Sequence, residues 1–444
     1  MSKEKKFVCE KNDELELDIT DLGSTGEGIG KIDGYTLFVK DALIGDKVRV
    51  KVIKTKKNYG YARLLEIIKP SEFRVEPECP VARQCGGCQL QHCSYEKQLS
   101  WKEEKVANCL RRIGGVPVYT EEEYKKIAAG KSEGSKSVEN TLNGTPIIME
   151  PILRMDRPVH YRNKAQLPIG IDDNQSMIMG FYSNRSHRII DCESCALQPQ
   201  SFTQAMDAFR KWADTSGNDI YREQTGKGRM RHLYLREAGA TGEVMACVVV
   251  NGNGLYHEDT LVKQLRECVR GLKSVIINSN RENTNVILGK KCRTVWGSDT
   301  IKDTLCGLTF HISPLSFYQV NPVQTKRLYD KVREYCGLKK HENFDVCSEG
   351  PAERHVILDL YCGVGSIGLY CADSAEMIIG IEAVKEAVVD ANRNAVINGI
   401  VNARYICGKA EEVLPAYIGG KEEEGTYDSE IAETGRKADI AILD

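Results

Sequence analysis

Alternating apolar and polar residues fill the first 70 positions of the chain. Five short runs show this alternation, at residues 14–21, 28–32, 35–40, 47–54 and 61–68, and they are separated by Gly26, Gly34, Gly45 and Gly60. A period of two residues predicts strands with one buried face, and the glycines between them predict turns. Five such strands predict a small OB-like β-barrel over residues 1–70.

The pattern changes after the barrel. A helix is predicted over residues 94–113, with Ser94 at its start and Gly114-Gly115 at its end. Residues 116–146 are rich in Glu, Lys, Ser and Gly, which predicts a mobile insertion that has no core of its own. Residues 71–115 therefore form a separate loop-and-helix segment.

Residues 147–310 contain runs with the two-residue period of strands and runs with the 3.6-residue period of helices. They predict a central α+β domain. Strand-like runs lie at 164–171, 177–182, 232–235, 244–250, 275–278 and 285–288, and helical runs lie at 201–213 and 259–269. Residues 311–444 begin with an amphipathic helix over 323–335, where Pro322 suits the first turn. The chain as a whole is predicted to be multidomain, with α/β and β parts.

A glycine-rich turn follows a buried strand in the last domain. The apolar run 356–360 contains Asp359 and leads into Gly363, Gly365 and Gly368, a G-x-G-x-x-G spacing that lets backbone approach a ligand. A second apolar run, 377–381, ends at Glu382, where a Rossmann-like fold places the acid that bonds ribose hydroxyls. These features predict half of a nucleoside pocket; a glycine turn in another α/β protein is the alternative.

Composition narrows the class of protein. The 444 residues suit about three domains, and 41% hydrophobic content is that of a globular protein. We expect a cytoplasmic protein with no membrane partner, because the chain contains no apolar run of about 18 residues and its start lacks a signal core. In that compartment the 17 cysteines are expected to bind metal where they cluster and to pack in cores elsewhere.

Basic residues are concentrated locally although the net charge is only -2. One run contains no acid: Lys47, Arg49, Lys51, Lys54, Lys56 and Lys57. Tyr59 and Tyr61 follow it, and aromatic faces beside lysines are typical of surfaces that stack bases and contact phosphates. A solvated charged face is the alternative interpretation.

Three cysteines share a Pro- and Gly-rich loop at Cys79, Cys85 and Cys88. Their spacing indicates a metal site, and both a tetrahedral zinc and a [4Fe-4S] cluster need a fourth ligand. The candidates in the sequence are Cys93, His92, Cys192 and Cys195. Spacing alone leaves zinc and iron open.

Several motifs resemble known families. G-E-G-I-G-K at 26–31 and Y-A-R-L-L-E at 61–66 resemble the TRAM domain, an RNA-binding barrel of RNA-modifying enzymes. D-L-Y-C-G-V-G-S at 359–366 and C-P-x4-C-G-G-C-x-L-Q-H at 79–92 resemble the cluster-containing RNA uracil-5 methyltransferases. Y-R-N-K, G-F-Y, R-H-L-x-L-R and S-F-x-Q-V-N occur in that family's order, so the resemblance covers nearly the whole chain.

The resemblance implies cofactors and site residues. It implies a [4Fe-4S] cluster on Cys79, Cys85, Cys88 and Cys195, with Cys192 as a rival fourth ligand. It implies S-adenosylmethionine bound by a larger set: Gln319, Tyr361, Gly363, Ser366, Glu382 and Asp444.

The resemblance also implies an RNA partner. It favours RNA contacts by Lys47, Lys51, Lys54 and Lys56 of the barrel and by Arg162, Lys164, Arg229 and Arg231 of the central domain. The implied activity is C5-methylation of a uridine by a monomeric enzyme, in 23S ribosomal RNA or alternatively in transfer RNA, with the base flipped out of its stack.

The last expectation concerns the nucleophile. Uracil C5 attacks a methyl group only after a thiolate has added at C6, so the reaction needs a cysteine and then a base. The resemblance places both beyond Asp444, in an S-C-N-P-like turn and a later glutamate, and matches Cys362 to a residue that is not the nucleophile. We therefore expect an incomplete, C-terminally truncated methyltransferase domain at 311–444 that is inactive; a noncatalytic RNA-binding protein is the alternative.

Overall fold

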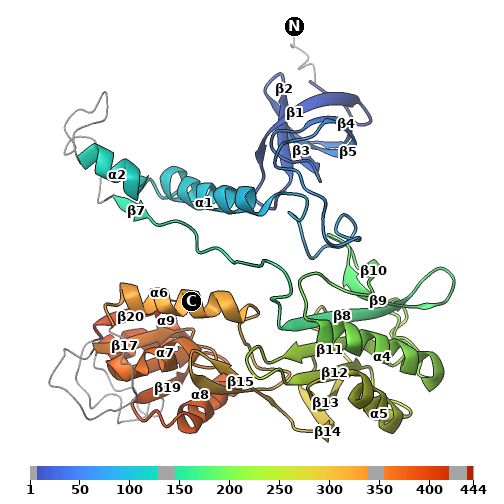
Figure 1. The fold of residues 1–444 in the computed structure, drawn as a ribbon, viewed down its shortest axis with the longest axis vertical. Coiled ribbons are helices and arrows are strands. Elements are labelled where there is room, and N and C mark those ends of the chain that lie inside the picture. Colours follow the sequence, from blue (N-terminus) through green and yellow to red (C-terminus); the bar gives the residue numbers. More distant parts are fainter. Residues whose placement is uncertain (1–7, 129–145, 339–354, 420–437, 444) are drawn as a thin grey trace. The chain divides into compact units, whose positions relative to one another are not determined.

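A computed structural model describes residues 8–128, 146–338, 355–419 and 438–443 (Figure 1). The chain forms two compact units. The first consists of Met1–Pro158 with Phe181–Ile190, and the second of Val159–Gly180 with Asp191–Asp444. Each unit has buried apolar clusters of its own.

Five strands of the first unit close into a barrel, as the alternation predicts. They are β1 (Glu14–Leu22), β2 (Gly28–Ile32), β3 (Tyr35–Lys40), β4 (Lys47–Thr55) and β5 (Tyr59–Lys69), in the order β1-β2-β3-β5-β4 (Figure 1). Inward residues such as Leu37, Val39, Val48 and Val50 are fully buried. Their polar neighbours in sequence face outward because successive side chains of a strand point to opposite faces.

A buried carboxylate ties the next segment to the barrel. Asp46 accepts hydrogen bonds from the N–H groups of Leu43, at 2.7 Å, and Ser71, at 2.8 Å, and pairs with Arg74. The cysteine loop follows, and then helix α1 (Tyr95–Arg112). Ser94 is the N-cap residue, but its side chain makes no capping hydrogen bond.

The structure differs from the expectation in the first part of segment 116–146. Strand β6 (Val118–Thr120) pairs in parallel with β7 (Ile147–Met149), and helix α2 (Glu121–Ala128) lies between them in sequence. Thr120 and Glu123 exchange hydrogen bonds at the start of α2, which is a capping box. Residues 129–145 of the predicted insertion lie outside the described residues.

A seven-stranded sheet, most of which belongs to the second unit, has the order β10-β9-β8-β11-β12-β13-β14. Its strands are β8 (Lys164–Ile171), β9 (Met177–Tyr182), β10 (Ile189–Asp191), β11 (Met230–Glu237), β12 (Val244–Val250), β13 (Leu272–Ser279) and β14 (Lys291–Gly297). Helices α4 (Gln200–Ser216) and α5 (Glu258–Cys268) pack on each other, α4 against β11 and α5 against β13 (Figure 1).

One predicted strand is wrong. Residues 285–288 form a loop, and the edge strand is β14, which follows them. The loop is fixed by asparagine side chains: Asn280 donates to the carbonyls of Val286 and Ile287, and Asn278 donates to that of Gly289. These bonds occupy the backbone that a strand would need.

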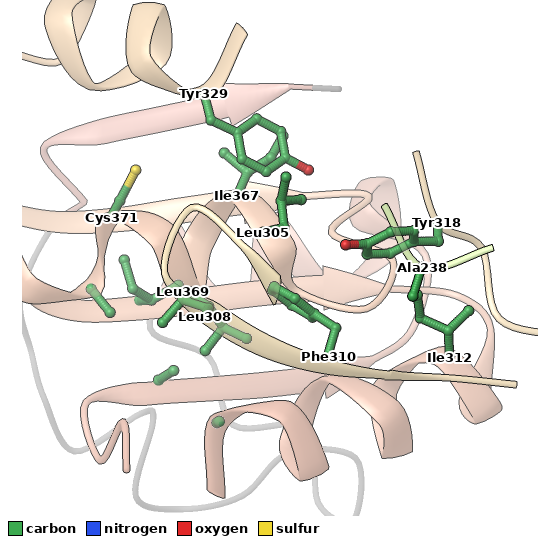
Figure 2. Close-up of a cluster of buried hydrophobic side chains, with 14 of the residues drawn as sticks. Ala238, Leu305, Leu308, Phe310, Ile312, Tyr318, Tyr329, Ile367, Leu369 and Cys371 are labelled. Atoms are coloured by element: carbon green, nitrogen blue, oxygen red, sulfur yellow. The ribbon is translucent and has the colours of Figure 1, made fainter. Parts of the chain in front are cut away.

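A hairpin connects the central sheet to the last domain. Strands β15 (Ile301–Leu305) and β16 (Leu308–Ile312) pair with each other, and helix α6 (Pro322–Tyr335) follows. Figure 2 shows Leu308 and Phe310 of this hairpin in one apolar cluster with Leu369. The hairpin is therefore part of the core of the last domain.

The last domain contains a parallel sheet of order β19-β18-β17-β20. Its strands are β17 (His355–Leu360), β18 (Ala375–Glu382), β19 (Ala403–Cys407) and β20 (Ile440–Leu443), and its helices are α7 (Ser366–Cys371), a short 3-10 turn η1 (Ala372–Ser374), α8 (Lys385–Ile397) and α9 (Ala410–Gly419). Both faces of β17 are buried, because Ile357 joins one apolar cluster while Leu358 joins another. A strand that is buried on both faces is mostly apolar, as residues 356–360 are apart from Asp359.

None of the helices in the described part of the chain is both long and apolar enough to cross a membrane.

We predict that His232 makes the fold acid-sensitive. Burial, with a smaller effect of Arg231, lowers the pKa of His232 from 6.5 to about 4, so the unfolded chain takes up a proton that the folded chain excludes. Stability is full above the unfolded pKa and falls as pH drops, by about 2 kcal/mol between neutral pH and about pH 4.5. Urea unfolding at the two pH values should show that the free energy of unfolding falls less for His232→Gln than for wild type. The matched variant at an exposed histidine, His187→Gln, should keep the wild-type pH dependence, and an unchanged loss in His232→Gln would contradict the prediction.

Candidate functional site

Two carboxylates hold the glycine loop after β17. Asp359, buried near the end of β17, accepts a hydrogen bond from the Gly368 N–H at 2.9 Å. Glu382, at the end of β18, accepts from the N–H groups of Gly363 at 3.0 Å and Val384 at 2.8 Å. Because β17 and β18 are parallel neighbours, both acids lie at the carboxyl edge of the sheet, where open α/β sheets bind ligands.

Two of the glycines leave no room for a side chain. A Cβ at Gly368 would lie 2.8 Å from Asp359 Oδ2 and 2.7 Å from Ile378 Cγ2. Gly365 has a φ of +76°, and a Cβ there would lie 2.4 Å from the hydroxyl of Tyr405. The glycine spacing thus allows the loop and α7 to pack directly on the sheet.

A small cavity of about 30 Å³ opens beside this loop. Tyr361, which is 51% exposed, has a left-handed backbone with a φ of +61°, a conformation that is strained in a non-glycine residue and common at ligand sites. Phe317 is 61% exposed and also lines the cavity. Two aromatic side chains are therefore accessible at the cavity.

The cavity brings together four of the predicted cofactor residues: Gln319, Tyr361, Gly363 and Ser366. The Ser366 hydroxyl is hydrogen-bonded to that of Tyr329 at 2.6 Å. Glu382 is connected to the loop through Gly363, and Asp444 lies outside the described residues.

The segment that carries Gln319 is fixed by the central domain. Asn163, just before β8, donates its backbone N–H to the Val320 carbonyl at 3.0 Å and its side-chain amide to the Gln319 carbonyl at 2.9 Å. The buried Arg236 of β11 donates to the Ser316 carbonyl. The backbone of 316–320 is thus held by two residues of the central sheet region.

Tyr318 fixes the same segment from the other side. Its hydroxyl donates to Asp303 Oδ2 at 3.1 Å, and the Asp303 carboxylate also accepts from the N–H groups of Gly239, at 3.1 Å, and Ala240, at 2.9 Å. Burial and the Asp303 carboxylate raise the pKa of Tyr318, so its hydroxyl stays protonated and remains a donor. Figure 2 shows the Tyr318 ring beside Ala238 in the buried cluster.

The environment of Cys362 argues against a nucleophilic thiolate. Burial raises the pKa of the Cys362 thiol, and the carboxylates of Asp359 and Glu382 raise it further. A thiolate is the reactive form of cysteine, and neighbouring cations rather than acids favour it. Cys362 is therefore suited to packing.

Three cysteines of the first unit lie in one loop, as the sequence shows. Cys85 Sγ accepts a hydrogen bond from the Gly87 N–H at 3.3 Å. Burial raises the pKa of the Cys85 thiol, the Gly87 bond lowers it in part, and Cys79 raises it again. Within the described ranges, no group of three or more His, Cys, Asp or Glu side chains is arranged to hold a metal.

The two candidate fourth ligands differ in their surroundings. Cys192, which belongs to the second unit, is buried, and its thiol donates to the Ser194 carbonyl at 2.6 Å. Cys195, in the same unit, is half-buried.

The basic residues of the barrel fall into two groups. Lys47 and Lys51 of β4 pair with Glu16, at 3.2 Å, and Glu14, at 3.8 Å, of the neighbouring strand β1. Arg49 pairs likewise with Glu66 of β5. By contrast, Lys54 and Lys56 line a pocket on the barrel. Cross-strand ion pairs therefore neutralise the first group and not the second.

The predicted RNA-binding cations of the central domain also differ. Arg231 is buried, donates to the carbonyls of Asn280 and Glu282, both at 2.8 Å, and stacks on Tyr221. The two hydrogen bonds from Nη1 and the burial of the side chain tie this guanidinium to the fold of the domain.

The other three lie nearer to solvent. Arg229 stacks on Tyr256 with its guanidinium carbon 3.9 Å from the ring centre. Arg162 and Lys164 flank Asn163, and burial, Arg236 and Arg162 lower the pKa of Lys164. Arg162 and Lys164 are thus the sequence neighbours of Asn163, which holds the segment that carries Gln319.

Sequence reasoning missed the residues that position this segment. Asn163 and Arg236 stand inside the motifs Y-R-N-K and R-H-L-x-L-R, which predicted RNA contacts instead. Asp303 carried no signal, since a single acid in a short strand resembles a surface residue. Tyr318 carried no signal either, because its burial is evident only from the structure.

Comparison with known families identifies the barrel. The TRAM domain model matches residues 10–65, which lie within the closed five-stranded barrel and the residues just before it. The first unit therefore contains an N-terminal TRAM domain.

Similar proteins match nearly the whole chain. An uncharacterized RNA methyltransferase of Clostridium tetani is 38% identical over 440 residues, covering 99% of this chain and 83% of the relative. One from Halalkalibacterium halodurans is 39% identical over 415 residues, covering 94% of this chain and 81% of the relative.

A solved structure shares the fold. The tRNA (uracil-54, C5)-methyltransferase of Pyrococcus abyssi, in complex with S-adenosyl-L-homocysteine, has a TM-score of 0.62 and 22% sequence identity. The match covers 89% of this chain and 80% of that one.

Two tyrosines with buried hydroxyl groups should respond differently to the loss of those groups. Tyr318→Phe removes a hydrogen bond to a buried carboxylate and should lower the free energy of unfolding by about 2 kcal/mol. The buried Tyr405 hydroxyl has no hydrogen-bond partner among the described residues, so Tyr405→Phe should leave stability unchanged or raise it. Urea unfolding of the two variants compares them directly, and equal losses would show that the Asp303 contact contributes nothing.

Proposed function

The chain belongs to the RNA methyltransferase family of these curated relatives, and on that premise we propose that it methylates carbon 5 of a uridine in RNA. S-adenosylmethionine is the proposed methyl donor and 23S ribosomal RNA the proposed substrate. The observation that supports a nucleoside cofactor is the Glu382 carboxylate at the end of β18, hydrogen-bonded to the glycine loop beside the cavity of Gln319 and Tyr361.

The residues present suit such a cofactor. When bound, S-adenosylmethionine supplies an electrophilic methyl group. Glu382 is an acceptor for ribose hydroxyls at the position where Rossmann-like folds hold them. The glycine loop offers backbone without side chains, and Gln319 reaches the same cavity from the opposite segment.

The RNA side of the reaction is supported by charge. Arg162 and Lys164 provide cations for phosphate close to the segment 316–320. Phe317 and Tyr361 present exposed aromatic surface at the cavity, which suits a base that has left its stack. Cys362 keeps its proton and is not assigned the role of nucleophile.

Methyl transfer and cofactor binding test this proposal together. The protein should transfer tritium from labelled S-adenosylmethionine to 23S ribosomal RNA and not to bulk transfer RNA. Glu382→Gln should weaken S-adenosylhomocysteine binding about 10- to 100-fold in calorimetry, because hydrogen bonds to a charged acceptor contribute about 1.5–3 kcal/mol. Glu386→Gln, an exposed carboxylate on α8, is the matched control.

The outcomes separate the alternatives. Tritium found in transfer RNA alone would show that transfer RNA, and not 23S ribosomal RNA, is the substrate. Label in neither RNA, with the cofactor still bound, would favour a noncatalytic RNA-binding protein.

We further propose that the cysteine loop holds a [4Fe-4S] cluster through Cys79, Cys85 and Cys88. The support is the placement of Cys79, Cys85 and Cys88 in one loop and the Gly87 N–H directed at Cys85 Sγ. Such bonds to sulfur adjust cluster properties in iron–sulfur proteins. The proposed methyl transfer contains no electron-transfer step, so the role assigned to the cluster is to order the loop.

Cluster content is measured on anaerobically purified protein. Cys88→Ala should lose the visible absorbance and the iron, while Cys109→Ala, an exposed cysteine of α1, should keep both. Zinc in place of iron in the wild-type protein would overturn the cluster assignment.

A further inference from the structure

Helix α6 contacts both walls of the cofactor cavity. It begins at Pro322, shortly after Gln319, which lines the cavity from one side. About two turns further along the helix, the Tyr329 hydroxyl is hydrogen-bonded at 2.6 Å to that of Ser366, which lines the cavity from the glycine loop. One helix is therefore bonded to both of the segments between which the cofactor is proposed to lie.

The start of α6 is fixed directly after Gln319. The Asn321 side chain accepts a hydrogen bond from the Gln324 N–H at 3.1 Å, which caps the helix. The Asn321 carbonyl accepts from the Thr325 hydroxyl at 2.7 Å. The position of the helix is thus tied to the position of the cavity wall that precedes it.

Tyr329 itself is held rigidly. It is 1% exposed and lies in one buried cluster with Ile367 of α7 (Figure 2). One turn later on α6, the buried Arg333 pairs with Asp373 at 2.6 Å and donates to the Tyr370 carbonyl. A shift of α6 against α7 would break this buried ion pair, so the Tyr329 hydroxyl keeps its place beside Ser366.

The contact between the two hydroxyl groups has a preferred direction. A hydroxyl donates one proton and accepts with its lone pairs. A phenol is more acidic than an alcohol, which favours Tyr329 as the donor and Ser366 as the acceptor. The Ser366 proton is then available to a ligand in the cavity, and consecutive hydrogen bonds of this kind strengthen one another.

The cavity beside Ser366 suits the amino-acid end of the cofactor. Its volume of about 30 Å³ has room for roughly two water-sized groups, which excludes an adenine ring and matches a carboxylate or an ammonium. Asp359 also lines the cavity, and its negative charge favours the ammonium. The Ser366 hydroxyl is left as the donor for the carboxylate.

We infer that Tyr329 is a positioning residue for S-adenosylmethionine, because its hydroxyl holds that of Ser366 as a donor to the carboxylate of the cofactor. Tyr329 is not among the residues that line the cavity, so it acts through Ser366. The inference rests on the proposed function in that S-adenosylmethionine is the ligand. It deepens that function by adding a residue outside the motifs from which the cofactor residues were predicted.

Calorimetry with two ligands tests this role. The first is S-adenosylhomocysteine, and the second is its decarboxylated form, which keeps the nucleoside, the sulfur and the ammonium. Tyr329→Phe should weaken binding of the first about 2- to 10-fold, the range expected for one neutral hydrogen bond, and leave binding of the second unchanged. Equal weakening of both ligands would overturn the proposal, since a merely structural role would produce it.

A double variant tests whether Tyr329 acts through Ser366. Ser366→Ala removes the donor itself and should weaken S-adenosylhomocysteine binding more than Tyr329→Phe does. The double variant Tyr329→Phe/Ser366→Ala should bind as Ser366→Ala alone, because residues that act through one contact are not additive. Additive losses of binding free energy would overturn the proposal.

Tyr370→Phe is the matched control. The Tyr370 hydroxyl donates to Asp330 at 2.5 Å between the same two helices, and Tyr370 is not among the residues that line the cavity. This variant should lose stability in urea unfolding and keep the affinity of wild type for S-adenosylhomocysteine. Equal losses of affinity in Tyr370→Phe and Tyr329→Phe would overturn the proposal, because packing of α6 on α7 would then explain binding.

The binding readouts are independent of methyl transfer. The expected pattern in Tyr329→Phe, together with no label in either RNA, would reject the proposed reaction and support this role. Equal weakening of the two ligands, together with labelled 23S ribosomal RNA, would reject this role and not the reaction.

Discussion

The buried carboxylate of Asp303 is the point on which the cofactor side of the second unit depends. It accepts hydrogen bonds from the backbone that follows β11 and from Tyr318, and it stands in the hairpin that joins the central sheet to the last domain. A buried charge is tolerated only when its lone pairs are satisfied, so the turn, the hairpin and the Tyr318 segment must come together at once. The position of Gln319 follows from this arrangement.

The same segment is held by Asn163 and Arg236, whose neighbours Arg162 and Lys164 carry the charge suited to phosphate. A displacement of Asn163 and the start of β8 would therefore move the backbone beside the cofactor cavity. The geometry provides a short physical route between a contact with RNA and the position of the cofactor residues.

Local patterns predicted the elements well where one face of each is buried. The barrel strands and the strand before the glycine loop follow from periodicity, and the helix after Pro322 follows from local backbone rules. The sequence misled at residues 285–288, which are apolar enough for a strand but are fixed as a loop by Asn278 and Asn280. The true edge strand β14 has mostly exposed residues and therefore lacks an apolar signal.

The candidate site was predictable in part for a similar reason. Glycine spacing and the acid at the end of β18 are local signals, so the glycine loop and the carboxylate that holds it could be predicted from the sequence. The division of the basic run into paired and unpaired cations could not be predicted. Glu14, Glu16 and Glu66 pair with cations of β4 because they lie on the neighbouring strands β1 and β5. Strand pairing brings together residues that are far apart in the chain. The partners of Asp303 are equally distant in sequence.

The chain crosses between its two units three times, at Pro158, at Gly180 and at Ile190. The hairpin tip of β9 and β10 belongs to the first unit, although most of the sheet belongs to the second. A protease that cut at only one of these crossings would therefore leave the two units covalently joined. Neither unit corresponds to one continuous stretch of the gene, so a single truncation that keeps all of one unit also keeps a segment of the other.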